Sequence, residues 1–416
     1  MHRAVDHVDD IKLRFCMVST YYPPYHFGGD AIFVQSLSRA LARRGHHVEV
    51  VHCEDAYNLR GARPGVEECP ADGVTVHRLH SRLGALSALL TQQLGVPGPK
   101  RAALERILSR GFDVVNFHNL SLVGGLGALG MSRAAVTLYT LHEHWLLCPT
   151  HIFWKNNRQP CDTPTCLSCC IRSGTPPQVW RYGGMRDASL AHCDLLLSPS
   201  EYTARRHASA GIQAPIRVLP TYSPLAPATA PTGPGPAHPR FLFAGRVTAS
   251  KGIVELLSTF ADLPRLGLDV VGGGDLLETL RRDYAHCDWI RFHGPVAHDQ
   301  MEAWYMNATA LVLPSRAPEV FPLTLLEAMA CGTPVIASDA GGSPEAVNRS
   351  GAGFVFRNDD QMRQALVALA DQPGLRTALS QRARAAYETY YCEDRYVSEY
   401  LGVVEAVRRP LAKAWP

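Results

Sequence analysis

The sequence contains no run of apolar residues long enough to cross a membrane. A transmembrane helix needs about 18 or more consecutive apolar residues, and none of the 416 positions opens such a run. The polar first ten residues also lack the apolar stretch of a secretion signal. From these absences we expect a cytoplasmic protein without a transmembrane segment.

An excess of charge of one sign is also missing. The 41 lysines and arginines outnumber the 38 aspartates and glutamates by three, so the net charge is +3. This excess is too small to indicate binding to nucleic acid or to a membrane surface. Hydrophobic residues make up 46 % and charged residues 19 %, the balance of an ordinary globular protein. The length favours two domains, and the composition does not indicate the oligomeric state.

Short apolar runs alternate with segments of helical periodicity in both halves of the chain. The run at residues 14–19 is followed by a loop that contains Gly28 and Gly29, and then by a helical pattern over residues 31–44. The pattern restarts at residues 240–244. Alternation of this kind predicts an α/β protein built on doubly wound parallel sheets. The first loop is not G-x-G-x-x-G, so it does not indicate a dinucleotide site.

Two carboxylates flank a predicted helix in the second half. An apolar run ends before Glu319, a helical pattern covers residues 322–331 with Glu327 inside it, and Gly332 ends the helix. The start of such a helix presents unpaired N–H groups to an anion above the strand ends. Ionised carboxylates beside an anion make sense if they accept hydrogen bonds from hydroxyls. The alternative is a packing helix with two solvated glutamates.

This stretch resembles a known family. Glu319-x7-Glu327, followed by Ala-Met-Ala-Cys-Gly-Thr-Pro-Val and by a Gly-Gly-x-Pro-Glu run that ends at Glu345, is similar to the nucleotide-sugar motif of retaining GT-B glycosyltransferases of family four. The resemblance implies two Rossmann-like domains that face each other across a cleft. It also implies a hexosyltransferase-like enzyme that moves a sugar from a UDP or GDP sugar to a small polar, natural-product or saccharide acceptor. The abundance of alanine, arginine, glycine and proline separately indicates a bacterial source.

The resemblance sets the expected domain boundaries. A Pro-rich stretch is expected to connect the two domains as a semi-rigid linker, and a C-terminal helix is expected to cross back to the first domain. Four of the tyrosines in this region are interpreted as packing residues: Tyr387, Tyr391, Tyr396 and Tyr400. The boundaries are an acceptor-side domain at 11–222 with a cysteine-rich loop at 146–175, the linker at 223–239, a donor-binding domain at 240–385 and the C-terminal helix at 386–416.

Residue roles follow from the same resemblance. A Gly-Arg-x4-Lys-Gly loop places two cations where a leaving diphosphate develops negative charge, so no divalent metal is expected for catalysis. The expected catalytic residues are His118, Arg246, Lys251 and Glu319. The expected donor-binding residues are Gly28, Gly29, Gly274, Val296, Phe321, Leu323, Thr324 and Glu327. Asp30 and His142 are expected on the acceptor side, and the alternative for His142 is that it only holds its loop in place.

The position of His118 at the end of a predicted strand supports a functional role. It ends an apolar strand that begins near Phe112, and strand C-termini face the ligand crevice in such sheets. A single histidine is often structural, but its match to the family's active-site histidine favours function. The chain departs from the family pattern at Glu143, where aspartate is usual, and at Pro322, where glycine is common. Proline removes one N–H there, which a first helical position does not need.

Five cysteines cluster between Cys148 and Cys170, and the chain has twelve in total. One interpretation is a structural zinc ion held by Cys148, Cys161, Cys166 and Cys169. A turn-rich loop needs a cross-link to hold its structure, and the spacing of these cysteines suits zinc. Buried free thiols or a single disulfide are the alternatives.

Two other functions remain open. The protein could be a pseudo-glycosyltransferase that couples a non-sugar group, or a non-catalytic partner that binds a nucleotide sugar. Intact motifs favour an enzyme, and a transfer assay separates the three.

Overall fold

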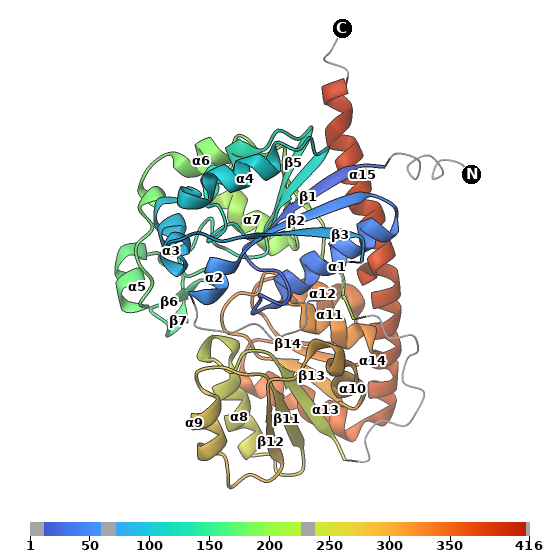
Figure 1. The fold of residues 1–416 in the computed structure, drawn as a ribbon. Helices are drawn as coiled ribbons and strands as arrows, with labels where there is room; N and C mark the ends of the chain where they lie inside the picture. Colours follow the sequence, from blue (N-terminus) through green and yellow to red (C-terminus); the bar gives the residue numbers. More distant parts are fainter. Residues whose placement is uncertain (1–11, 60–71, 226–237, 413–416) are drawn as a thin grey trace, which may run out of the picture. The chain divides into compact units, whose positions relative to one another are not determined.

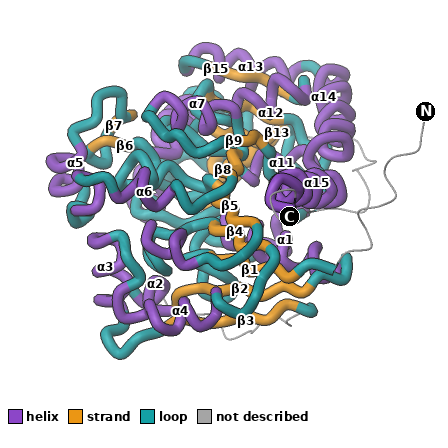
Figure 2. The backbone as a smooth tube through the Cα atoms, turned by 90° about the horizontal axis from the view of Figure 1, so that it is seen from above, coloured by secondary structure: helices purple, strands orange, loops and turns teal. Residues whose placement is uncertain are grey.

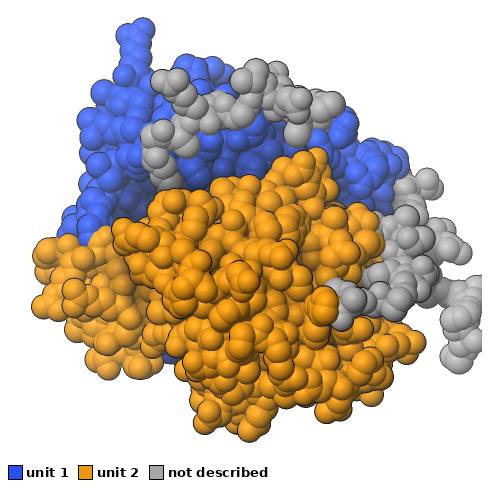
Figure 3. Space-filling view, turned by 90° about the horizontal axis from the view of Figure 1, so that it is seen from below, with its two compact units in different colours: residues 1–151, 174–220, 393–416 blue, residues 152–173, 221–392 orange. Residues whose placement is uncertain are grey.

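The computed structural model describes residues 12–59, 72–225 and 238–412. The chain forms two compact units (Figure 3). The first comprises residues 1–151, 174–220 and 393–416, and the second comprises residues 152–173 and 221–392. Residues 226–237, most of the predicted Pro-rich linker, lie outside the described residues.

The first unit is built on a seven-stranded sheet (Figure 1), whose strands follow the order β3-β2-β1-β4-β5-β8-β9 (Figure 2). All six strand pairs are parallel. Both faces of its central strands are covered, which is why Phe15 to Val18 form an unbroken apolar run with no exposed surface. The strands are β1 (Arg14–Val18), β2 (His47–Cys53), β3 (Val74–Leu79), β4 (Val114–Phe117), β5 (Val136–Thr140), β8 (Leu195–Ser198) and β9 (Ile216–Val218).

Helices and helical turns connect these strands. Ser200 begins α7 as its N-cap, because its hydroxyl oxygen accepts a hydrogen bond from the Thr203 amide at 3.2 Å. The elements are α1 (Gly29–Arg43), α2 (Glu54–Asn58), α3 (Ala85–Leu94), η1 (Gly98–Lys100), α4 (Arg101–Leu108), η2 (Leu126–Met131), η3 (Val179–Tyr182), α6 (Met185–Leu190), α7 (Glu201–Ser209) and α15 (Glu393–Ala412).

The second unit repeats this design with a six-stranded sheet in the order β12-β11-β10-β13-β14-β15. The strands are β10 (Arg240–Ala244), β11 (Gly267–Val271), β12 (Ile290–Gly294), β13 (Ala310–Leu313), β14 (Val335–Ser338) and β15 (Gly353–Phe356). The helical elements are η4 (Ala249–Lys251), α8 (Ile253–Ala261), α9 (Leu277–Asp283), η5 (His298–Gln300), α10 (Met301–Met306), α11 (Leu323–Ala330), α12 (Ser343–Ser350), α13 (Asp359–Asp371), α14 (Pro373–Ala386) and a π-helical turn η6 (Tyr387–Tyr391). The predicted α/β class with two Rossmann-like parallel sheets is confirmed.

Each sheet has a point at which the strand order reverses. In the first unit β1 lies between β2 and β4, and in the second β10 lies between β11 and β13. The connections that leave the carboxyl ends of these central strands run in opposite directions and leave a crevice between them. Ligands of open α/β sheets bind at such points, so each unit offers one candidate position.

The long helix α15 lies beside α1 in the first unit (Figure 2). Arg43 pairs with Glu393 at 2.5 Å and Arg44 pairs with Asp394 at 2.7 Å. The Tyr396 ring meets Phe33 edge-on at 5.3 Å. All four tyrosines predicted to pack are buried: Tyr387, Tyr391, Tyr396 and Tyr400.

Residues 152–173 belong to the second unit. They form a small antiparallel pair, β6 (Trp154–Lys155) and β7 (Gln159–Pro160), followed by α5 (Cys166–Arg172). The Trp154 ring lies under the Arg316 guanidinium at 5.7 Å. The structure therefore does not confirm the prediction that the cysteine-rich loop is an insertion in the first domain. Among the described helices, none is both long and apolar enough to cross a membrane.

Candidate active site

In the second unit, the loops after β10 and β13 are joined by hydrogen bonds. The Ser250 carbonyl accepts hydrogen bonds from the amides of Arg316 and Ala317, both at 2.9 Å. Gly252 adopts a left-handed φ of +68°, and a Cβ there would lie 1.9 Å from the Pro314 oxygen. Glycine is thus required where the two loops touch, and Lys251, which precedes it, is held against the loop that carries Glu319.

Lys251 and Glu319 form an ion pair at this crevice. The lysine Nζ lies 2.6 Å from Glu319 Oε1, and both side chains keep some exposure to solvent, 22 % and 16 %. Burial alone would raise the pKa of Glu319, but Lys251, the Ser315 hydroxyl and Arg246 together hold that pKa below its ordinary value. Glu319 is therefore an ionised hydrogen-bond acceptor at neutral pH.

Helix α11 begins four residues after Glu319. Pro322 is its N-cap, one position before the first helical residue at which the sequence analysis placed it. The amides of Leu323 and Thr324 open the helix and have no carbonyl one turn earlier to bond. Phe321, Leu323 and Val296 are partly buried and pack against the same apolar cluster of this unit. The helix start thus offers N–H groups and partial positive charge beside Glu319.

Glu327 lies in the second turn of α11 and is 5 % exposed. Its Oε2 accepts a hydrogen bond from the Tyr305 hydroxyl at 2.6 Å, and its Oε1 lies 3.7 Å from His298 Nδ1. Burial raises the pKa of Glu327, while His298 and the Tyr305 hydroxyl oppose that rise. The ionised form is therefore less strongly favoured at Glu327 than at Glu319.

The loop after β11 lies close to the loop after β10, which carries Arg246 and Lys251. The amides of Val247 and Leu276 bond to the carbonyls of Gly273 and Val247, at 2.9 and 3.2 Å. A Cβ on Gly274 would lie 2.3 Å from the Val247 carbonyl oxygen. The absence of a side chain at Gly274 is what lets this loop lie beside Arg246.

In the first unit, the predicted residues gather at the carboxyl ends of β1, β4 and β5. Asp30 lies in the first turn of α1, and its Oδ2 accepts a hydrogen bond from the Asn119 amide group at 3.3 Å. The Asn119 carbonyl accepts hydrogen bonds from the Thr20 amide and hydroxyl, at 2.7 and 2.9 Å. The loop that holds Gly28 and Gly29 is therefore tied to the end of β4.

His118 and His142 form a hydrogen-bonded pair beside these groups. His118 Nδ1 and His142 Nε2 are 2.9 Å apart, and His118 is fully buried. Burial and His142 place the pKa of His118 well below its usual range, and burial lowers the pKa of His142 to about 4 while Asp30 opposes the shift. Both rings are thus neutral at pH 7. His118 Nε2 is buried and has no hydrogen-bond partner among the described residues.

The predicted zinc site is not supported. Within the described chain, which includes all four predicted ligands, no group of three or more histidine, cysteine or acidic side chains is arranged to hold a metal ion. Local contacts explain part of this. Cys148 Sγ lies 3.3 Å from the Thr150 hydroxyl, and Cys169 Sγ accepts a hydrogen bond from the Asn156 amide at 3.2 Å. Cys161 and Cys166 lie in the same segment as Cys169 without completing a metal-binding group.

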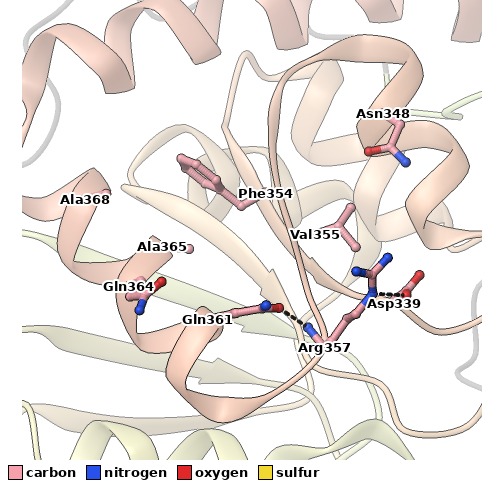
Figure 4. Close-up of a pocket in the computed structure, with 9 residues that line it drawn as sticks. All are labelled: Asp339, Asn348, Phe354, Val355, Arg357, Gln361, Gln364, Ala365 and Ala368. Carbon is pink, nitrogen blue, oxygen red and sulfur yellow. Dashed lines mark hydrogen bonds and ion pairs between the residues drawn. The ribbon is translucent and has the colours of Figure 1, made fainter.

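A separate pocket of about 450 Å³ lies in the second unit between α12, β15 and α13 (Figure 4). Arg357 Nε donates to Asp339 Oδ2 at 2.8 Å, and the Arg357 amide donates to the Gln361 side chain at 2.8 Å. None of the predicted site residues lines this pocket.

Sequence reasoning did not identify Tyr305, His298, Ser315 and Asn119, which contact the predicted residues. Ser315 lies four residues before Glu319, and Asn119 directly follows His118. A search for hydroxyl and amide side chains close in sequence to the predicted site residues would have found these two. Tyr305 reaches Glu327 from another helix, so no local pattern marks it.

Comparisons with known proteins identify relatives of this chain. The model of the family described as glycosyl transferases group 1 matches residues 231–386, and that of glycosyltransferase family 4 matches residues 27–222. The chain is 30 % identical to a D-inositol 3-phosphate glycosyltransferase of Catenulispora acidiphila, over 92 % of this chain and 93 % of that protein. It is 31 % identical to a protein of the same name from Xylanimonas cellulosilytica, over 86 % of this chain and 87 % of that one.

Solved structures show the same fold. Sucrose-phosphate synthase from Thermosynechococcus elongatus superposes with a TM-score of 0.72 at 20 % identity, over 97 % of this chain and 100 % of that one. Anabaena HepE, solved in complex with UDP and glucose, gives a TM-score of 0.63 at 16 % identity, over 96 % of this chain and 98 % of that one. At these identities the likeness concerns the fold alone.

Proposed function

This chain belongs to the family 4 glycosyltransferases, and from that premise we propose that it transfers a sugar, with retention of configuration, from a UDP or GDP sugar to a small polar acceptor. The observation that carries the proposal is the Lys251–Glu319 ion pair at the carboxyl ends of β10 and β13. It places a cation and a carboxylate next to the start of α11, which suits a ligand with a diphosphate beside sugar hydroxyls.

The groups around the pair divide between the two halves of such a donor. Lys251, Arg246 and the amides of Leu323 and Thr324 bind the diphosphate, because cations and helix N-termini both favour anions. Glu319, which stays ionised at neutral pH, accepts hydrogen bonds from hydroxyls of the transferred sugar.

Glu327 binds the ribose of the nucleotide. It is buried and accepts a hydrogen bond on one oxygen from Tyr305, so its other oxygen can accept from a ribose hydroxyl. Gly274 lets backbone approach the nucleotide without a side chain in the way, and Val296 and Phe321 supply apolar surface for it.

Transfer proceeds by exchange of one glycosidic bond for another. The bond between the anomeric carbon and the diphosphate oxygen breaks, the acceptor oxygen bonds to that carbon, and the acceptor proton passes to the leaving phosphate. Arg246, Lys251 and the helix start stabilise the negative charge that develops on the diphosphate, which is the main catalytic effect expected of such a site. Retention is inferred from the resemblance of the Glu319–Glu327 motif.

In the first unit, Asp30, His118 and His142 serve the acceptor side. His118 contributes a neutral ring with one free nitrogen to a sugar or acceptor oxygen. A hydrogen-bonded pair of neutral histidines orients that nitrogen, and Asp30 adds an acceptor for hydroxyls.

Because cations of the chain neutralise the diphosphate, transfer is expected to persist in excess EDTA. The measurement is the initial rate of transfer by protein that has been dialysed against EDTA, with and without added Mg²⁺. A rate that falls at least about tenfold without the metal would show that Arg246 and Lys251 do not suffice.

A binding and transfer screen tests the proposal as a whole. Thermal unfolding in the presence of UDP, GDP, ADP and TDP sugars identifies the donor, because a ligand that binds the folded state raises the melting temperature. Transfer is then assayed with D-inositol 3-phosphate, the compound in the names of the relatives, and with other polyols. Product NMR reports the anomeric configuration. Binding without transfer or hydrolysis would favour a non-catalytic partner, and a coupled non-sugar product would favour a pseudo-glycosyltransferase.

The ribose contact makes a prediction of its own. We expect the protein to bind the nucleoside diphosphate of its donor about 10–100-fold more tightly than the 2′-deoxy analogue, because the analogue leaves a buried charged acceptor without its hydroxyl. Dissociation constants from titration calorimetry measure this ratio. The ratio is expected to shrink in Glu327→Gln and to stay unchanged in Glu278→Gln, whose carboxylate pairs with Arg281 on the exposed side of α9.

A further inference from the structure

A buried tyrosine on α10 makes the closest contact to the proposed ribose-binding carboxylate. Tyr305 is completely buried, and its hydroxyl donates to Glu327 Oε2 at 2.6 Å. Resting on the function proposed above, we infer that Tyr305 is a positioning residue for the donor: it fixes the Glu327 carboxylate so that Oε1 faces the ribose.

The position of Tyr305 is itself determined by its surroundings. The Thr333 hydroxyl donates to the Tyr305 carbonyl at 2.7 Å, and the Thr333 amide donates to the Ala328 carbonyl at 2.8 Å. Thr333 thus links α10 to α11, the helix that carries Glu327. The tyrosine ring lies in the same buried cluster as Leu325, Leu326 and Met329 of that helix. A ring packed at native density keeps its rotamer, so its hydroxyl is a fixed donor.

This contact leaves the two carboxylate oxygens with different tasks. Oε2 is occupied by Tyr305, and Oε1 lies 3.7 Å from His298 Nδ1, beyond ordinary hydrogen-bond distance. A carboxylate anchored at one oxygen cannot rotate without losing that bond. The second oxygen therefore keeps one direction, and a bound ribose hydroxyl meets an acceptor that is already oriented.

The Tyr305 hydroxyl also affects the pH at which Glu327 becomes ionised. Burial raises the pKa of Glu327, and the Tyr305 hydrogen bond and the His298 ring oppose that rise. Burial and Glu327 raise the pKa of Tyr305 strongly, so it stays a neutral O–H donor. The other titratable groups around the pair are Cys331, whose thiol stays protonated because burial raises its pKa to about 12, and beyond it Glu302 and Arg384.

The sign of the pH effect follows from these contacts. Only ionised Glu327 accepts hydrogen bonds on both oxygens, so nucleotide affinity falls as the pH drops through the pKa of Glu327. Removal of the Tyr305 hydroxyl removes one interaction that lowers this pKa. In Tyr305→Phe the fall in affinity is therefore expected to begin at a higher pH than in the wild type.

The test compares Tyr305→Phe with Tyr400→Phe as its matched control. Tyr400 lies in the first unit and is equally buried, and Tyr400→Phe also removes one hydrogen bond, which the Tyr400 hydroxyl accepts from Asn116 Nδ2 at 3.2 Å. Dissociation constants for UDP and GDP and for their 2′-deoxy forms are measured from pH 5 to 9. Tyr305→Phe is expected to weaken binding of the ribonucleotide about tenfold, to reduce its preference over the 2′-deoxy form, and to change kcat at saturating donor by less than about threefold.

A double variant shows whether Tyr305 acts through Glu327. In a Glu327→Gln background, Tyr305→Phe is expected to have little further effect on affinity, which is the signature of coupled residues. Equal losses in both backgrounds, or an unchanged affinity, ribose preference and pH profile in Tyr305→Phe, would overturn the inference while leaving the transferase proposal intact. A wild-type protein that binds none of these nucleotides would refute both. Thr333→Val, which keeps the phenol but loosens its helix, provides a milder variant if Tyr305→Phe does not fold.

Discussion

Lys251→Ala is expected to reduce kcat by about 10²–10³-fold or more, the range measured when one charge-stabilising group is removed from an active site. The ammonium lies 2.6 Å from Glu319 at the end of η4, and in the proposed complex it is a principal cation on the leaving diphosphate. In that complex Arg246 does not replace it, because the lysine also pairs with Glu319, the proposed acceptor for sugar hydroxyls. The measurement is the steady-state rate of transfer at saturating donor.

The matched control for this variant is Lys12→Ala, whose exposed ammonium donates to the Arg44 carbonyl in the first unit. It removes the same charge and is expected to leave kcat unchanged. Lys251→Arg keeps the charge and is expected to retain part of the activity. Near-normal turnover in Lys251→Ala would refute the assignment of this loop to the diphosphate.

Lys251→Ala is also expected to change the stability of the folded protein, by an amount that depends on pH. The pKa of Glu319 is held below the ordinary 4.5, so its interactions stabilise the folded state above that value. This contribution is lost as the pH falls through the lower pKa of the folded protein. The stability difference between wild type and Lys251→Ala is thus expected to be largest near neutral pH and to shrink in acid, as urea unfolding at several pH values would show.

The sheets could be predicted from the sequence because buried parallel strands leave a plain signal. Strands covered on both faces read as continuous apolar runs, so the observed β1 (Arg14–Val18) and β10 (Arg240–Ala244) lie within a residue of the predicted runs. The positions of Lys251 and Glu319 then follow from topology, since Lys251 follows the carboxyl end of β10, Glu319 follows that of β13, and the two strands are neighbours in the sheet. Their direct ion pair could not be predicted, because the sequence pattern does not determine how closely the two loops that carry these side chains approach each other.

The cysteine-rich segment and Tyr305 mark the limits of such reasoning. Cysteine spacing suits zinc only if the turns bring the thiols together. Here left-handed residues, such as Asn156 and Asn157, form the turn of a short hairpin, and Cys169 of α5 accepts a hydrogen bond from the Asn156 amide of that turn instead. Tyr305 lies 22 positions before Glu327, and their contact arises only when α10 packs on α11. Contacts made by packing between elements leave no periodic trace in the sequence.

Gly341→Ala is expected to lower kcat/KM by about 100-fold or more, because it displaces Glu319 itself, and misplacement by about 1 Å can cost that much. Gly341 has a φ of +72°, and a Cβ there would lie 2.1 Å from the Glu319 carbonyl oxygen and 2.4 Å from its amide nitrogen. The next amide, of Gly342, bonds to the same carbonyl at 2.8 Å. The backbone of Glu319 must therefore move to admit a methyl group.

Gly374→Ala separates this local displacement from the general effect of replacing a glycine. Gly374 lies in the first turn of α14, and a Cβ there would meet nothing within 4 Å. Alanine favours the helix by about 1 kcal/mol over glycine, so this variant is expected to be at least as stable as the wild type and fully active. Activity is compared well below each melting temperature, with circular dichroism as the check on folding. If Gly341→Ala is folded and still transfers sugar at the wild-type rate, the position of Glu319 does not limit the reaction, because the backbone that carries it has moved without consequence.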